Sequence, residues 1–222
     1  MKNIIIKIKK LWVVCLLPAA ILTGCNLFGL DVQQSYDYDY SAGMRSNELH
    51  CTVWEFLQAR KTDYRIFLEG IEYAGLQNMY NEPNATYIVL RNSVFTNTTT
   101  GFFLYNPLIN VDGAQYTPNT LLDYPKETVR QLLLYHIVKG AWTWSNLPFG
   151  PTWYPTYANG ETAFVNMFVA KTVPPNIQFN NFPGHYVQGK TARTTNLKAS
   201  NGSYVHVLDD AYLMQPSIDL LK

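Results

Sequence analysis

The chain has 222 residues, of which 47% are hydrophobic and 15% are charged, which is enough apolar material for one well-buried domain. Four of its 17 basic residues lie within the first ten positions, so the remainder carries 13 basic residues against 16 acidic ones. A slightly acidic domain has no basic stripe that could follow phosphates. Charge therefore argues against nucleic acid as a partner.

The N-terminal segment has the form of a secretory signal. Lys2, Lys7, Lys9 and Lys10 precede an apolar stretch from Leu11 to Leu22. A basic region followed by a short apolar region is typical of such signals. The apolar stretch has 12 residues, whereas a membrane-spanning helix needs roughly 20.

The stretch Leu22-Thr23-Gly24-Cys25 follows and resembles a bacterial lipobox. In that motif the leader is cut before the cysteine, and the sulfur is then acylated. We therefore expect residues 1–24 to be a lipoprotein signal peptide and Cys25 to carry the lipid, such as palmitate, that holds the protein on the membrane. The alternative is an ordinary secretory signal with an incidental cysteine.

Residues 25–49 are interpreted as the acylated N-terminus and an extended tether, because no helical or strand period is sustained there. The alternation from Tyr36 to Tyr40 has a second interpretation, as a docking strip. Removal of Cys15 with the leader and acylation of Cys25 would leave Cys51 as a single thiol. No internal disulfide could then form, and the hydrophobic core must hold the domain together.

Two helices are expected after the tether. Thr52 and Glu55 have the spacing of a capping box for the first helix. Asp63 is expected to cap the second, which Gly75 should end. The apolar run 85–90 is rich in β-branched and aromatic residues and predicts a buried strand.

The middle of the chain predicts a polar turn over 97–101, a short strand over 102–105 and a third helix over 125–138. Pro125 suits the first position of that helix. Its apolar face would also carry His136.

The C-terminal part predicts strands, over 163–172 and over 194–210. Within the second range, Asn201-Gly202 is a strong hairpin signal. Helices that come first and strands that come later, without alternation, favour an α+β fold.

Several stretches, in order, resemble the landmarks of a fasciclin domain. They are "TVWEFLQAR", "ATYIVLRNSVF", "LLLYHIVKG" and "NLKASNGSYVHVLDDAYLMQP". The last is the most specific, with Ser200, Asn201, Gly202, His206 and Asp209 in place. In the second stretch the proline of the family pattern is missing, although Phe95 keeps the apolar position.

The resemblance implies a β-sheet wedge with N-terminal and central helices packed alongside, over residues 50–222. It also implies a role in adhesion and extracellular binding, in which the pair Tyr135-His136 belongs to a family motif. Lipid-anchored versions resembling this chain are found in Bacteroidetes, often beside outer-membrane glycan-uptake systems.

Both His136 and His206 are expected to be packed and hydrogen-bonded rather than catalytic. The former shares a helix face with leucines, and the latter lies between Val205 and Val207 on a predicted strand. No sequence motif supplies a nucleophile, a metal-ligand set or a phosphate loop beside them. We therefore expect no enzyme activity, no cofactor and no metal.

An aromatic loop follows the third helix and is the main candidate for ligand binding. Its candidate residues, within a stretch also rich in Pro and Gly, are Trp142, Trp144, Trp153, Tyr154 and Tyr157. Exposed aromatic faces bind sugar rings and anchor protein interfaces. The alternative is that the rings fold back and cap the core.

The sequence thus predicts a non-enzymatic binding or adhesion lipoprotein of the outer membrane, facing the cell surface. One form of this hypothesis is a glycan-binding accessory of an uptake system. The other is a structural or assembly subunit that binds cell-envelope or extracellular proteins.

Overall fold

A computed structural model describes residues 47–172, 176–184, 194–209 and 211–216, and the backbone of three two-residue strands. The chain divides into two units, Met1–Arg45 and Ser46–Lys222. In the first unit, β1 (Asn26–Leu27) pairs antiparallel with β2 (Leu30–Asp31), inside the segment expected to be extended. The predicted signal peptide and Cys25 lie outside the described residues.

The second unit begins with two helices, α2 (Val53–Ala59) and α3 (Lys61–Ala74). The predicted capping box is confirmed, since Glu55 N–H donates to Thr52 Oγ1 at 3.2 Å and Thr52 N–H to Glu55 Oε2 at 2.8 Å. The predicted stop is also confirmed, because Gly75 adopts the left-handed conformation that favours glycine, with φ of 69°.

The predicted cap at Asp63 is wrong. The second helix already begins at Lys61, and the Asn92 side chain accepts a hydrogen bond from Ile66 N–H at 3.0 Å. Asp63 instead pairs with Arg91. The Asp63 side chain, which sequence spacing assigned to a local helix cap, thus pairs with a residue 28 positions away.

One four-stranded sheet has the order β11-β12-β3-β6. Its strands are β3 (Ala85–Leu90), β6 (Ile137–Lys139), β11 (Thr194–Lys198) and β12 (Tyr204–Leu208). The predicted strand over 85–90 is confirmed, and all its residues are buried. It pairs parallel with β12 and antiparallel with β6, so it lies in the middle of the sheet.

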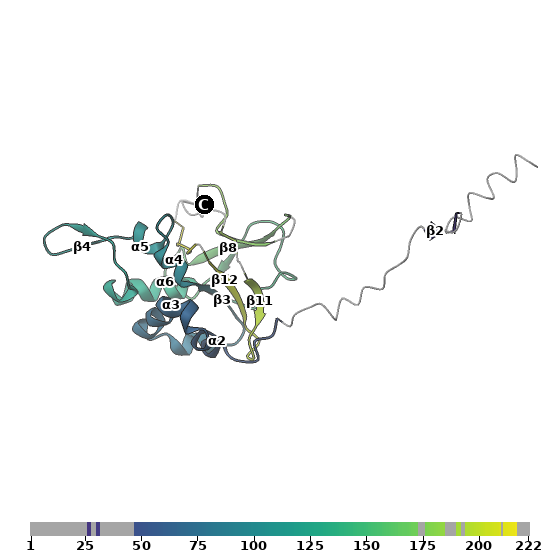
Figure 1. Cartoon of the computed structure of the whole chain (residues 1–222), viewed down its shortest axis with the longest axis horizontal. Coiled ribbons are helices and arrows are strands. Elements are labelled where there is room, and N and C mark those ends of the chain that lie inside the picture. Colours follow the sequence, from purple (N-terminus) through teal and green to yellow (C-terminus); the bar gives the residue numbers. More distant parts are fainter. Residues whose placement is uncertain are drawn as a thin grey trace, which may run out of the picture. The chain divides into compact units, whose positions relative to one another are not determined.

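The other four-stranded sheet is antiparallel, with the order β10-β9-β8-β7. Its strands are β7 (Thr152–Pro155), β8 (Phe164–Ala170), β9 (Asn176–Phe179) and β10 (Lys190–Thr191). An isolated bridge joins Val138 of β6 to Thr156, the residue after β7, and so links the two sheets. Two sheets with separate helices confirm the predicted α+β class (Figure 1).

Short elements lie between the sheet strands along the chain. They are η1 (Gln77–Asn81), α4 (Asn92–Thr96), α5 (Phe102–Tyr105), β4 (Leu108–Ile109), β5 (Gln115–Tyr116) and η2 (Leu121–Asp123). The short strand predicted over 102–105 is wrong, because this segment is α5. Its first two residues, Phe102 and Phe103, both pack against the ring of Tyr124, an arrangement that one helical turn permits.

The third predicted helix is α6 (Lys126–Tyr135), which is shorter than expected at both ends. Pro125 is the residue before the first helical turn, and His136 is the residue after the last. Ile137 already belongs to β6 and pairs with Tyr87 of β3. The apolar residues keep their helical spacing beyond Tyr135, but pairing of Ile137 with a strand about 50 residues earlier ends the helix there.

The hairpin predicted at Asn201-Gly202 is confirmed. Ala199 N–H donates to Ser203 O at 2.9 Å and Gly202 N–H to Ala199 O at 3.1 Å, with Gly202 at φ of 82°. The predicted domain start at residue 50 is slightly late. Leu49 N–H donates to Lys198 O and Lys198 N–H to Asn47 O, both at 2.8 Å, so residues 47–49 extend the sheet edge.

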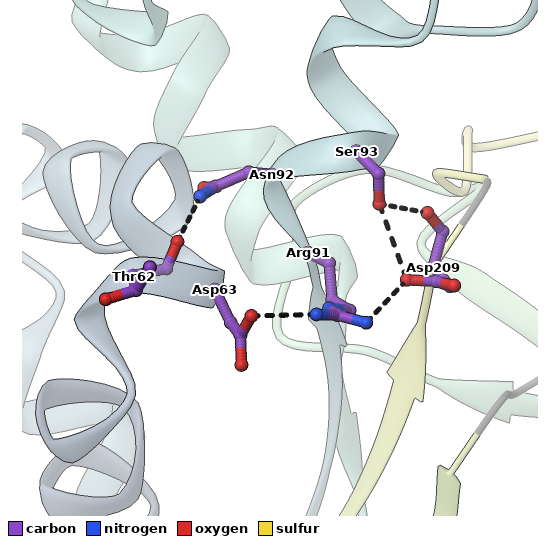
Figure 2. A pocket seen from close by; sticks show the side chains of 6 residues that line it. All are labelled: Thr62, Asp63, Arg91, Asn92, Ser93 and Asp209. Carbon is purple, nitrogen blue, oxygen red and sulfur yellow. Dashed lines mark hydrogen bonds and ion pairs between the residues drawn. The ribbon is translucent and has the colours of Figure 1, made fainter.

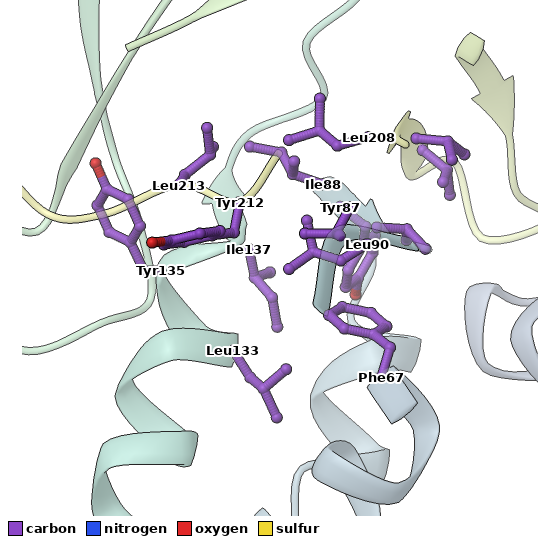
Figure 3. Packing of buried hydrophobic residues seen from close by; sticks show 14 of the residues in the cluster. Phe67, Tyr87, Ile88, Leu90, Leu133, Tyr135, Ile137, Leu208, Tyr212 and Leu213 are labelled. Carbon is purple, nitrogen blue, oxygen red and sulfur yellow. The ribbon is translucent and has the colours of Figure 1, made fainter. Parts of the chain in front are cut away.

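The hydrophobic core lies between the helices and the β3-containing sheet. Figure 3 shows Phe67 of α3 and Leu133 of α6 directed toward the strand residues, among them Leu90 and Ile137. All four side chains are buried. Within the described parts of the chain, no helix has both the length and the apolar character needed to cross a membrane.

Replacing Leu133 by Ala should lower the free energy of unfolding by about 2–5 kcal/mol, because it leaves a cavity between α6 and the sheet. Leu122→Ala is the matched control, since that side chain is exposed and its loss should change stability by less than about 0.5 kcal/mol. Urea unfolding of both variants measures the difference. Equal losses would contradict this assignment of the core.

Candidate functional site

His136 is fixed at the end of α6 by both ring nitrogens. Its Nδ1 lies 2.8 Å from Leu132 O, and its Nε2 accepts a hydrogen bond from Leu213 N–H at 3.0 Å. The side chain is only 1% exposed, which confirms the prediction of a packed histidine. Burial lowers the pKa of His136 to about 4, because desolvation penalises the charged ring.

Tyr135 extends this contact to the second sheet. Its hydroxyl donates to Phe164 O at 2.9 Å and accepts from the Asn180 side-chain amide at 3.0 Å. The same amide donates to Met214 O at 3.1 Å. The Tyr-His pair therefore joins the end of α6 to the antiparallel sheet and to the C-terminal segment.

His206 has the same chemistry on β12 but holds a different segment. Its Nε2 donates to Trp142 O at 3.0 Å, and its Nδ1 accepts from Asn196 N–H at 3.3 Å. The side chain is fully buried, as predicted, and desolvation lowers its pKa to about 4. A strand histidine thus binds the backbone at the start of the aromatic loop.

Two further side chains of the sheet hold the same part of the loop. Thr86 Oγ1 accepts from Trp142 N–H at 2.8 Å and donates to Gly140 O at 2.7 Å. Asn196 Oδ1 accepts from Trp144 N–H at 3.1 Å. We call Thr86, Asn196 and His206 the loop clamp, because together they fix the backbone of residues 140–144 from three strands.

Gly140 is required where the loop leaves β6. Its φ is 99°, and a Cβ at this position would lie 2.8 Å from Trp142 Nε1. The indole N–H of Trp142 donates to Lys139 O at 2.9 Å, so the ring is held over this turn. Absence of a side chain at residue 140 thus allows the ring to close down on the backbone.

The five aromatic candidates do not share one exposed face. Trp142 is half-buried and packs on Tyr154 at a ring distance of 4.3 Å. Tyr154 is 6% exposed and is corrected here to a core residue. Trp144 is half-buried at the start of a turn, so the two tryptophans do not lie on one extended segment.

Rings toward the outside of the loop remain partly accessible. Trp153 precedes Tyr154 on β7 and therefore points to the opposite face, where it meets Phe182 at 4.7 Å. Tyr157 is half-buried beneath the Lys139 ammonium group. Phe149 is 65% exposed and lies beside Lys171, which makes it the most accessible ring of the loop.

A polar hollow of about 250 Å³ lies at the carboxyl ends of β3 and β12 (Figure 2). Arg91 bridges two carboxylates there, with 2.7 Å to Asp63 Oδ1 and 3.1 Å to Asp209 Oδ1. Ser93 Oγ donates to Asp209 O. Sequence reasoning noted Asp209 only through the family motif and missed Arg91, because nothing local indicates their pairing.

Both buried histidines have structural hydrogen-bond partners. Each buried histidine uses both ring nitrogens for backbone groups of the described residues. Within the described ranges, no group of three or more His, Cys, Asp or Glu residues is placed to hold a metal. What the site offers is a loop of fixed backbone that carries partly exposed rings.

The two buried histidines should make stability depend on pH in a defined window. The unfolded chain takes up protons on these rings near pH 6.5, whereas the folded chain does so only near pH 4. Their contribution is therefore complete above pH 6.5 and is lost as pH falls toward 4, by roughly 3 kcal/mol for each ring. Urea unfolding between pH 5 and 6.5, where most carboxylates stay ionised, measures the slope of the free energy of unfolding against pH.

His136→Gln is the control for this titration, since it removes one titrating ring. It should reduce the slope by about half, whatever its effect on stability at pH 7. A variant that keeps the full slope would show that other groups cause the pH dependence.

Comparison with known proteins identifies the family. The sequence profile of the Fasciclin domain matches residues 62–214. No curated protein matches the sequence. A solved structure, the FAS1 domain pair from the insect cell adhesion molecule fasciclin I, is similar at 15% identity and a TM-score of 0.48, over 74% of this chain and 51% of that one. The chain thus spans about half the length of that structure. Because the profile covers more than half of the chain, the protein belongs to the fasciclin domain family.

Proposed function

We propose that the protein is a non-enzymatic binding and adhesion module, held on the outer membrane by a lipid at Cys25 and facing the cell surface. The aromatic loop, residues 140–157, is its recognition surface. The observation that carries this proposal is the loop clamp, in which the buried Thr86 of β3 and His206 of β12 and the half-buried Asn196 of β11 hold the loop backbone. Membership of a family of adhesion domains agrees with a binding role.

A clamped loop is a better binding surface than a free one. Ordering a mobile loop on binding costs free energy, and a loop that is already ordered avoids much of that cost. Partly buried hydrogen bonds to the backbone of Trp142 and Trp144 supply this order without using the outer rings. Folding therefore leaves Phe149, Trp153 and Tyr157 partly accessible.

The proposed ligand is a glycan, as for an accessory protein of an outer-membrane uptake system. Aromatic faces on a rigid loop pack against the apolar CH faces of sugar rings. Phe149 offers the most accessible such face. The second candidate is an assembly subunit for cell-envelope or extracellular proteins, and the same rings favour it because aromatic residues anchor protein interfaces.

Cys25→Ala should abolish the proposed anchor. Without the thiol the chain cannot be acylated, and it should accumulate as precursor or as protein that stays in the aqueous phase of a detergent partition. The unchanged chain should enter the detergent phase at the mass of the acylated form. A variant that still enters that phase at the mature mass would exclude Cys25 as the lipid site.

Phe149→Ala and Tyr154→Ala form a matched pair that separates recognition from folding. The first removes an exposed ring and should change the free energy of unfolding by less than about 0.5 kcal/mol, while it weakens binding by about 1–2 kcal/mol if the ring is a hot spot. The second removes a buried ring and should cost roughly 3–5 kcal/mol of stability. Melting curves measure the stability of both variants. Retardation in native gels cast with neutral polysaccharides measures their binding.

If the Phe149 variant is retarded as strongly as the unchanged chain, the proposal that the aromatic loop is the recognition surface is contradicted. No retardation of the unchanged chain by any polysaccharide in the panel would remove the glycan hypothesis and leave the assembly subunit.

A further inference from the structure

The antiparallel sheet contains a buried amide oxygen that has no hydrogen-bond partner. Among the residues that the structure describes, three buried side-chain atoms lack a partner, namely Tyr80 Oη, Trp144 Nε1 and Asn166 Oδ1. Asn166 lies within β8 and is only 1% exposed. Burying a polar atom without a hydrogen bond costs free energy, so this oxygen calls for a physical explanation.

Two neighbouring buried amides, Gln178 and Asn180, are paired. Gln178 bonds through both amide atoms to the side chains of Asn176 and Asn181. Asn180 Oδ1 accepts from Asn166 N–H at 3.0 Å, and its amide nitrogen donates to Tyr135 Oη at 3.0 Å. The fold thus satisfies the backbone of Asn166 but not its side-chain oxygen, which points to a partner from outside the chain.

Three aromatic residues share the sheet face of Asn166. Trp153 of β7 lies directly opposite Asn166. The N–H and C=O of Asn166 both bond to Asn180 on the other side of the strand, so Trp153 and Asn166 form a non-hydrogen-bonded pair. In such a pair the Cα atoms are about 4.5 Å apart and the side chains lie close together. Phe164 and Phe168 are two residues away along β8 in either direction and therefore lie on the same face.

This face is apolar, uncharged and partly accessible. Phe164 is 37% exposed, and Trp153 and Phe168 are half-buried, whereas the opposite face of the sheet packs into the core. Strands β7, β8 and β9 contain no charged residue. Aromatic side chains around a few placed polar groups are typical of sites that bind small molecules.

We propose that the face around Asn166 is a subsite for one neutral sugar unit, and that a hydroxyl of this sugar donates a hydrogen bond to Asn166 Oδ1. This inference rests on the proposed glycan-binding function, and it extends the recognition surface from Trp153 of the aromatic loop onto β8. A neutral donor suits this acceptor, because binding then places no unpaired charge among the rings.

The Trp153 ring has a second part in this subsite. Asn166 Oδ1 is buried in the free protein, so the sugar reaches it when the neighbouring Trp153 ring turns aside from Phe182, which it contacts at a ring distance of 4.7 Å. The ring then packs against the apolar CH face of the bound sugar. Trp153 lies on β7, the edge strand of the sheet, so its ring borders the open side.

An unpartnered amide makes stability and binding respond differently to its removal. In the free protein, an apolar side chain in place of Asn166 removes a buried polar group that forms no bond, so the folded chain loses nothing. In the complex, the same replacement leaves the sugar hydroxyl without its acceptor. An amide with a structural partner would instead lower stability when it is replaced.

Asn166→Leu and Gln178→Met form a matched pair that tests the subsite, since each exchanges a buried amide of the same sheet for an apolar side chain. The first should leave the Tm unchanged or raise it, whereas the second should lower the Tm, because Asn176 and Asn181 lose their partner. In native gels cast with a neutral polysaccharide that retards the unchanged chain, Asn166→Leu should need about ten times more polysaccharide for equal retardation, the effect of one lost hydrogen bond. Asn166→Ala removes the amide without adding volume, and it should weaken retardation to the same extent.

The outcomes separate this subsite from the proposed function. If both Asn166 variants are retarded like the unchanged chain while Phe149→Ala is not, the subsite is overturned and the aromatic loop remains the recognition surface. A Tm that falls in both Asn166 variants as far as in Gln178→Met would reveal a structural partner for the amide and would also overturn the subsite. If no neutral polysaccharide retards the unchanged chain, the glycan-binding function fails and the subsite fails with it.

Discussion

The hydrogen bond from the buried His206 ring to Trp142 O is the contact on which the proposed recognition surface depends. A neutral imidazole has one donor and one acceptor, and here both are used, the acceptor by Asn196 N–H. Burial keeps the ring neutral by lowering its pKa, and neutrality preserves this division of roles. One side chain thereby joins two strands of the sheet to the loop that carries the tryptophans.

His136 likewise uses both ring nitrogens to hold the backbone of another segment. Its ring connects α6 to Leu213, and the neighbouring Tyr135 connects the same helix end to the antiparallel sheet. Both motif histidines therefore hold irregular backbone against regular structure. This physical role accounts for their place in the family motif, and the proposed recognition surface uses side chains outside the core.

Local patterns predicted much of the fold, because the residues concerned interact within a few positions of one another. The Thr52–Glu55 capping box, the Gly75 stop, the buried strand Ala85–Leu90 and the hairpin at Gly202 are of this kind. The failures required distant partners. The helix that ends at Tyr135 stops because Ile137 pairs with Tyr87, and Asp63 is taken by Arg91.

The candidate site shows the same division. Sequence identified the aromatic loop and the two packed histidines, but it gave no sign of the loop clamp, because Thr86 of β3 is far along the chain from Asn196 and His206 of the β11–β12 hairpin. Nor could it show that Tyr154 turns inward while Trp153 turns outward, since that depends on which face of β7 meets the core.

Hydrogen exchange of His206→Phe compared with His136→Phe tests the central claim most directly. Phenylalanine keeps a ring of similar size in the core but removes both hydrogen bonds. The account predicts faster amide exchange over residues 141–147 in the first variant and over residues 211–216 in the second, each with the other segment still protected. Loss of protection spread evenly over the domain in both variants, or an aromatic loop that stays protected without His206, would contradict it.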